Sequence, residues 1–321
     1  MSRWAPHVLG LGTPLLVAVS LYVGGIWQGL PILVILGFYP LLDLIVGESG
    51  EVEGIEEDKM FNSIIHLHGL CMPTIVAFFL ALVWMRGFDE YTWLGIISVG
   101  LTTGASGIVA AHELGHRKPK SSSWWLARSG LLSILYLHFT TEHNFTHHKH
   151  WARPIDPTSS PRGRGIYLHF LRTLPLQLKG ALKARPKDTK ISLMVESLLL
   201  IGLFLISPVI LGVFLMQALV AVFLLEYVNY LQHHGLFRGA EERMGPQHAW
   251  ESRHRWSRWT LMELPLHPAH HLTSSLPAWK LSTYEESPRL PFGYYTSFWL
   301  ALFPPLWHVV MKSHIERAST K

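Results

Sequence analysis

The stretch YTWLGIISVGLTTGASGIVAAHELGHRKPK, from Tyr91 to Lys120, joins an uncharged apolar run to a pair of histidines. Residues Tyr91–Ala111 carry no charge, and a helix needs about 20 apolar residues to cross a lipid bilayer. His112 and His116 follow directly, four positions apart and therefore on one face of a continuing helix. The stretch predicts a membrane helix that runs into a metal-binding sequence.

The composition of the whole chain agrees with a membrane protein. Of its 321 residues, 49% are hydrophobic and 15% are charged, whereas soluble domains carry about 25% charged residues. The single cysteine excludes an internal disulfide and any iron–sulfur centre held by several cysteines. Twenty histidines are left to explain, and no histidine tag accounts for them.

Six apolar stretches predict an all-α, polytopic fold that occupies residues 1–321 as a single integral membrane domain. We expect the first stretch to be a retained span, because it lacks a signal-peptide cleavage site and a second stretch follows at once. The predicted spans are residues 8–27, 30–46, 64–85, 91–111, 191–211 and 213–230. Two long segments, 112–190 and 231–321, are left to form a histidine-rich cap.

The positions of Lys and Arg predict the orientation in the membrane. All of the 27 basic residues except Arg86 fall on one side of the six predicted spans. The positive-inside rule makes this side cytoplasmic, so we expect the cap and both termini in the cytoplasm, at the inner (plasma) membrane of a bacterium. Orientation and contact with anionic membrane lipid then explain the net charge of +5, and a nucleic-acid partner is not expected.

Two segments of the cap are apolar enough to lie against the membrane. Residues 165–185 place apolar side chains at helical spacing with Arg and Lys between them, which is typical of an interfacial amphipathic helix. Residues 291–310 are apolar and aromatic, but Pro304 and Pro305 interrupt them. This interruption favours an interfacial position over a seventh span.

Clusters of histidine on the cap side predict a metal centre. They are His112 and His116, then His143, His147 and His148, then His267, His270 and His271, with His233 and the weaker candidate His234 at the end of span six. Imidazole is the commonest side-chain metal ligand, and helical i, i+4 spacing aims two rings at one point. Eight or nine nitrogens are too many for one zinc ion and suit two metal ions. Nitrogen ligands without thiolate favour iron that performs oxygen chemistry.

Other polar residues near the clusters are expected to support the ligands. They are Glu113, Glu142, His138, Asp156, Glu226, Asn229 and His248. Asp43 lies inside span two, where a carboxylate is either functional or a helix-end residue that reaches the interface. Isolated histidines such as His7 and His169 are interpreted as packed or solvated. A merely basic interfacial surface is a poor explanation for the clusters, because Lys and Arg already supply that charge.

Two other functions remain open from the residues alone. HELGH also matches the H-E-x-x-H signature of zinc proteases, so a membrane metalloprotease built on His112, Glu113 and His116 is an alternative. It would leave the other clusters mostly unexplained. A metal carrier or sensor is the third hypothesis and would bind metal without turnover. The identity and number of the bound metals discriminate among them.

Four motifs together resemble a known family. HELGHR (112–117), EHNFTHH (142–148), NYLQHHGL (229–236) and LPLHPAHH (264–271) are similar to the histidine motifs of membrane alkane 1-monooxygenases, in the fatty-acid-desaturase-like diiron superfamily. The resemblance implies six spans, a cytoplasmic diiron cap and no catalytic residue beyond the ligands. The implied ligands are His112, His116, His143, His147, His148, His233, His267, His270 and His271.

The resemblance also implies an activity and partners. The reaction would be O2-dependent hydroxylation of a terminal C–H bond of an alkane or of an alkyl or methyl group, with two iron ions as cofactor. Electrons would come from a separate rubredoxin or ferredoxin and its NAD(P)H-dependent reductase.

Departures from the family pattern leave the substrate open. Gln232, His233 and His234 stand where the family often has Glu-His-Tyr, and Leu266 and Pro268 flank a histidine that polar residues usually flank. Aryl-methyl hydroxylases such as xylene monooxygenases, and desaturases, are also similar. The chain length of the substrate is expected to depend on residues of spans two to four.

Overall fold

The computed structural model describes residues 3–319. Residues 1–2 and 320–321, the ends of the predicted single domain, lie outside the described residues. The described chain is almost entirely helical and contains no strand, only the isolated bridges Glu48–His254 and Glu251–Arg289. Six of its helices are long and apolar enough to cross a membrane. The prediction of an all-α membrane fold with six spans is therefore confirmed.

The helices of the structure define where each of the six spans begins and ends. The spans are Ala5–Val23 (which ends in α1, Gly12–Val23), Gly25–Val46 (with α2, Leu30–Ile32, and α3, Tyr39–Val46), Lys59–Arg86 (α4), Thr92–Gly115 (α5, Thr92–Thr102, and α6, Ile108–Gly115), Pro186–Ile206 (α11) and Pro208–His233 (α12). Span three starts at Lys59 and not at residue 64, span five is Pro186–Ile206 and not 191–211, and span six starts at Pro208 and not at residue 213. Pro208 begins the helix of span six, because proline suits a first helical turn and the Ser207 hydroxyl accepts the Val209 N–H.

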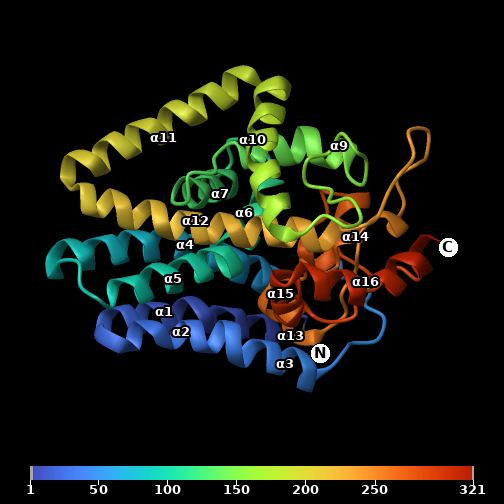
Figure 1. The fold of residues 1–321 in the computed structure, drawn as a ribbon, viewed down its shortest axis with the longest axis horizontal. Coiled ribbons are helices and arrows are strands. Elements are labelled where there is room, and N and C mark those ends of the chain that lie inside the picture. Colours follow the sequence, from blue (N-terminus) through green and yellow to red (C-terminus); the bar gives the residue numbers. More distant parts are fainter. Residues whose placement is uncertain (1–2, 320–321) are drawn as a thin grey trace.

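Most of the remaining helices form the cap at one end of the spans, whereas the helix Ser122–Leu132 packs alongside spans three and four (Figure 1). The remaining helices are α7 (Ser122–Leu132), α8 (Phe139–Glu142), α9 (His148–His150), α10 (Ile166–Ala184), α13 (Arg255–Thr260), α14 (His267–Leu272), α15 (Tyr294–Leu302) and α16 (Pro304–Ser319). In Figure 1, α10 runs across the direction of the spans, as an interfacial helix would. Residues 291–310 form parts of α15 and α16, broken near Pro304, and do not make a seventh span.

Span four is the centre of the bundle and span five lies at its edge. In their most apolar stretches, 83% of Thr92–Gly115 is buried, against 22% of Pro186–Ile206. Glycines allow the close packing of span four: a Cβ on Gly104 would come within 2.6 Å of Leu224, and one on Gly107 within 2.5 Å of Met72. The helix that carries His112 and His116 is thus held between α4 and α12.

Asp43 joins the second span to the cap. Its carboxylate is fully buried and accepts hydrogen bonds from the Ser257 hydroxyl at 2.8 Å and from the backbone N–H of Tyr295 at 3.0 Å. These donors lie in α13 and in the first turn of α15. Asp43 therefore does not reach the interface as a helix-end residue would; it is a buried acceptor that caps α15.

Candidate metal centre

Nine histidines converge in two adjacent groups on the cap side of the bundle. The first group is His112, His116, His143, His148 and His270, and the second is His147, His233, His267 and His271. Within each group, one potential ligand atom per residue lies within 4.8 Å of all the others. The four histidine-bearing segments are far apart in sequence, so the tertiary fold assembles both groups.

The Nε2 atoms face one another at short distances. In the first group, His148 Nε2 lies 3.0 Å from that of His143 and 3.1 Å from that of His270. In the second, His267 Nε2 lies 3.0 Å from that of His233 and 2.8 Å from that of His271. The distances place the rings around two common points, as two metal ions would require.

A π-turn decides which histidine belongs to which group. Residues His143–His147 form one turn of π-helix between α8 and α9. A wider turn brings residues five apart onto one face, so His143 pairs with His148, while His147 points to the second group. The i, i+4 spacing predicted that His143 and His147 aim at one point, and this was wrong. It holds for His112 with His116 and for His267 with His271.

The electrostatics of both groups suit a bound cation. Burial, reinforced by neighbouring histidines, lowers the pKa of His116 to about 3 and holds the pKa values of His143, His267, His270 and His271 well below the ordinary value. The rings are therefore neutral, and a neutral imidazole has a lone pair for a metal. The buried Nε2 atoms of His112 and His116 have no hydrogen-bond partner. Buried imidazole nitrogens that face one another, with lone pairs that no hydrogen-bond donor satisfies, fit a site for metal ions.

Asp156 orients one ring of the second group. Its carboxylate lies 3.0 Å from His147 Nδ1 and also accepts hydrogen bonds from the hydroxyls of Thr158 and Ser159. Burial opposes ionisation, but the contacts with His147 and these donors lower the pKa of Asp156 to about 2. The ionised carboxylate fixes the proton of His147 on Nδ1 and leaves Nε2 free to coordinate.

The other residues predicted to support the site occupy several positions. Glu226 accepts hydrogen bonds from Tyr136, Gln177 and Asn229. The side chains of Glu142 and His138 are buried and form no hydrogen bond within the described residues. His248 instead binds Glu242 near the surface, at 2.8 Å. His234 is buried against His308 and lies outside both groups.

Trp151 is a neighbour of the site that the sequence did not reveal. Its ring stacks on His271, with centroids 4.3 Å apart and planes 18° from parallel, and it is fully buried. The only available signal was its position directly after the TEHNFTHHKH stretch, which does not predict its orientation. Pro268, a departure from the family pattern, lies in the first turn of α14 and leaves His267 and His271 on one face.

The geometry disfavours a zinc protease built on HELGH. Glu113 would have to act as general base, yet its carboxylate pairs with Arg117 at 2.9 Å and lies 3.3 Å from the backbone N–H of Ala278. Three further histidines close the first group around His112 and His116. A catalytic zinc needs an open coordination position beside a free base.

Two small apolar cavities lie between the spans and the histidines and share lining residues, and together they are called the apolar passage. A small cavity lies against both groups: it is lined by His112 and His143 of the first, by His267 of the second and by Asn229, among others. A second cavity shares Gly104, Val109 and Val228 with it and continues between spans two, four and six to α15. Residues of spans two, four and six and of the cap line these two cavities, and the expectation that spans two to four set the chain length of the substrate stays a prediction.

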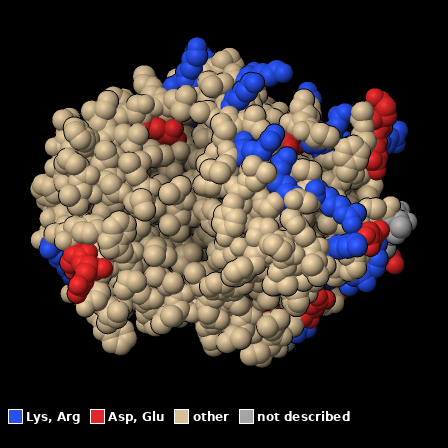
Figure 2. Space-filling model, viewed as in Figure 1, with Lys and Arg blue, Asp and Glu red and all other residues tan. Residues whose placement is uncertain are grey.

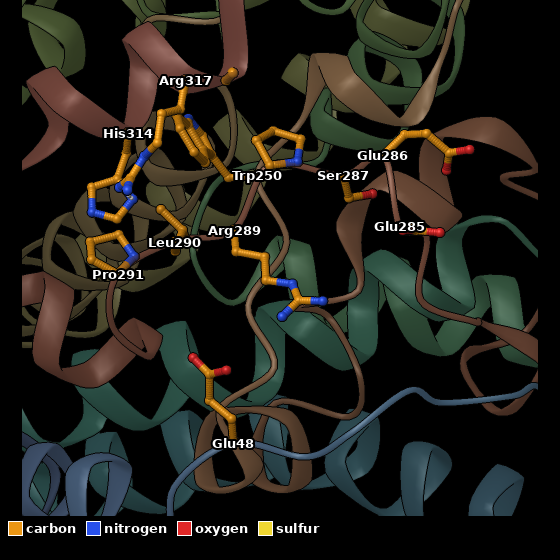
Figure 3. Close-up of a pocket in the computed structure, with 12 residues that line it drawn as sticks. Glu48, Trp250, Glu285, Glu286, Ser287, Arg289, Leu290, Pro291, His314 and Arg317 are labelled. Carbon is orange, nitrogen blue, oxygen red and sulfur yellow. Dashed lines mark hydrogen bonds between the residues drawn. The ribbon is translucent and has the colours of Figure 1, made fainter. Parts of the chain in front are cut away.

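Another cavity, of about 560 Å³, lies in the cap away from both histidine groups (Figure 3). Glu48, Glu285, Glu286 and Arg289 give it carboxylates and a cation, and Trp250 forms one wall. Nearby, the backbone of Glu251 bonds those of Pro288 and Leu290. We interpret this cavity as a seam between cap segments, because none of the nine histidines lines it.

Comparisons with known proteins agree on one family. Residues 91–301 match the family model described as fatty acid desaturase. The chain is 32% identical to alkane 1-monooxygenase 1 of Pseudomonas aeruginosa, over 90% of this chain and 83% of that protein. It is 31% identical to alkane 1-monooxygenase 2 of the same species, over 98% of this chain and 90% of that protein. The hydroxylase component of the Pseudomonas putida xylene/toluene monooxygenase is 26% identical to this chain, over 67% of this chain and 62% of that protein.

Proposed function

This chain belongs to the fatty acid desaturase family and, within it, to the alkane 1-monooxygenases, and we propose that it hydroxylates a terminal C–H bond of an alkane or alkyl group. The reaction would consume the substrate, O2, two electrons and two protons, and yield an alcohol and water. The observation that carries the proposal is the pair of histidine groups beside an apolar passage.

Two iron ions would be held by the five histidines of the first group and the four of the second. Bound iron would supply the O2 activation and C–H cleavage that amino-acid side chains cannot perform. The residues of the chain do the rest. Phe139, Ile108 and Val228 would hold the substrate end beside His112 and His143 and exclude water. Asp156 would hold the proton of His147 on Nδ1.

The cap is proposed to face the cytoplasm of a bacterium, with the spans in its inner (plasma) membrane. Figure 2 supports this placement, because Lys and Arg gather over the cap end, while the opposite end of the spans shows one small charged cluster. That end holds Arg86, whose guanidinium donates to the backbone carbonyls of Leu21 and Tyr22.

Oxygen labelling tests the activity. We expect membranes that contain the wild-type chain, a reducing partner and ¹⁸O2 to convert a medium-chain alkane to the 1-alcohol with one ¹⁸O atom per molecule, because O2 is the proposed oxygen source. Mass spectrometry of the product measures this. Label from H2¹⁸O in place of ¹⁸O2, or peptide cleavage without alcohol, would contradict the proposal. A methyl-substituted arene run in parallel tests the related aryl-methyl activity.

Val228 is expected to influence which substrates fit, because it lines both cavities of the passage. Val228→Phe should shorten the longest alkane accepted, since the added ring fills a narrow passage, and Val228→Ala should lengthen it. Chromatography of products from an alkane series measures the change. Val209→Ala is the matched control, because Val209 lies on the same helix, is 49% exposed and faces away from the passage. Identical profiles for all variants would show that the substrate takes another route.

The electron donor is proposed to be a separate acidic carrier of the rubredoxin or ferredoxin type with its NAD(P)H-dependent reductase. The support is a cavity of about 300 Å³ lined by Arg153, Arg162, Arg164 and Arg172. Burial and the adjacent Arg172 lower the pKa of Arg164, so like charges face each other there. Asp156 also lines this cavity and binds His147, which connects the surface to the second group.

Reversal of this charge should weaken the carrier reaction specifically. We expect Arg164→Glu with Arg172→Glu to raise the KM for an acidic carrier by about tenfold or more at low salt, because complementary charge speeds docking. The rate with a small chemical reductant should not change. Lys187→Glu, on α11 and outside this cavity, is the control. Equal KM values for both variants would place the docking surface elsewhere.

A further inference from the structure

A large cavity that is separate from the apolar passage also reaches the first histidine group. It has a volume of about 660 Å³ and is lined by the segment after span four, by α7, by the π-turn and by the start of α11. His116 lines it, whereas His112 and His143 line the small cavity of the apolar passage. The first histidine group is therefore flanked by two cavities, and the proposed reaction uses only one.

The walls of this second cavity resemble the boundary between lipid tails and water. Leu132, Ile191 and Val195 make one side apolar, and Trp124 and Trp125 lie beside them. The Trp125 side chain is 57% exposed. Tryptophan gathers at the level of lipid head groups, because its ring is apolar and its N–H is polar. In Figure 1, α11 stands apart from the other spans here, and little of it is buried.

Cations form part of the lining of this cavity. Arg117, Lys120, Arg128 and Arg185 line it, against a single carboxylate, Asp188. Arg117 pairs with Glu113, and Arg128 donates to the Ser192 hydroxyl at 2.8 Å. Lys120 and Arg185 form no ion pair within the described residues; the Arg185 guanidinium lies over the Phe145 ring at 4.4 Å. The lining of this cavity thus combines an excess of positive charge with apolar side chains.

We propose that this cavity binds an anionic phospholipid. An acyl chain would lie between α7 and α11, and the phosphate would lie near Lys120 and Arg185. Basic pockets between membrane helices on the cytoplasmic side bind lipid head groups through this combination of charge and apolar surface. A free alkane is a poor occupant, because it offers nothing to the four cations. The bound lipid would cover the His116 side of the centre and exclude water from it.

The proposal is tested on the purified, full-length chain in a neutral detergent, by thermal unfolding and by analysis of co-purified lipid. Phosphatidylglycerol should raise the Tm of the wild type by roughly 2–4 °C and phosphatidylcholine by much less, because ligand bound to the native state stabilises it. Lys120→Gln with Arg185→Gln should lose most of this difference. Lys187→Gln with Lys190→Gln keeps it, because these lysines lie on the same side but outside the cavity.

The outcomes separate this site from its alternatives. Equal shifts with both phospholipids, or an undiminished shift in the Lys120 and Arg185 variant, would overturn the proposal. A shift with decanoate as large as that with phosphatidylglycerol would also overturn it and would indicate a carboxylate site. The measurement needs neither turnover nor iron, so its failure is distinct from failure of the proposed hydroxylation. Unchanged helical circular dichroism shows that the variants are folded.

Discussion

His143→Ala and His116→Ala should each lose the metal of the first group and retain that of the second, while His147→Ala and His233→Ala should do the reverse. Hydroxylation should fall below detection in all four variants, because both groups are proposed to be needed. The assignment follows from the π-turn at His143–His147, which sends adjacent histidines to different groups. Iron content and Mössbauer spectra of each purified variant measure the loss.

The informative comparison is between His147 and its neighbours. If the turn were an ordinary α-helix, His147→Ala would resemble His143→Ala in the iron site that it empties. If the π-turn is correct, His147→Ala empties the same iron site as His233→Ala. His150→Ala is the matched control, because His150 lies in the same stretch and in neither group, so its iron content should equal that of the wild type.

Asp156→Asn should reduce iron affinity or activity by about 10- to 100-fold, the usual effect of losing a carboxylate that orients a metal-binding imidazole. The amide can still accept the His147 Nδ1–H through its oxygen, but it lacks the charge and disturbs the hydrogen bonds from Thr158 and Ser159. Asp156→Ala should therefore be more severe. Iron retained during titration with a chelator measures the affinity.

Glu316→Gln is the control for the Asp156 variants. Glu316 forms an ion pair with Arg162, which lines the same arginine-rich cavity as Asp156, but both partners are about half exposed. An exposed pair contributes little to stability. Loss of iron in this variant, or full retention in Asp156→Ala, would show that Asp156 does not support the second group.

The sequence predicts the six spans well, because the length of an apolar stretch is a local property. The segment Thr92–Gly115 is visible as a span from its composition, and His112 and His116 share a face through simple helical spacing. Pairings that depend on irregular backbone are not predictable in this way. Nothing in HNFTH signals a π-turn, so the sequence left open which histidines share a metal ion, and helical i, i+4 spacing alone points His143 to His147.

Long-range contacts are the other limit. Asp156 and Trp151 reach His147 and His271 through a loop whose path depends on the packed cap. The passage is lined by Leu224, Tyr227 and Val228 of span six because Gly104 lets α12 approach span four closely. Period and composition cannot reveal which apolar face meets which neighbour.

Metal content of the purified wild-type chain tests the central claim most directly. The account predicts about two irons per chain and negligible zinc, because two nitrogen-rich groups without thiolate are each suited to one iron ion. One zinc per chain and no iron, retained after growth in iron-rich medium, would contradict it and restore the metalloprotease hypothesis built on His112, Glu113 and His116.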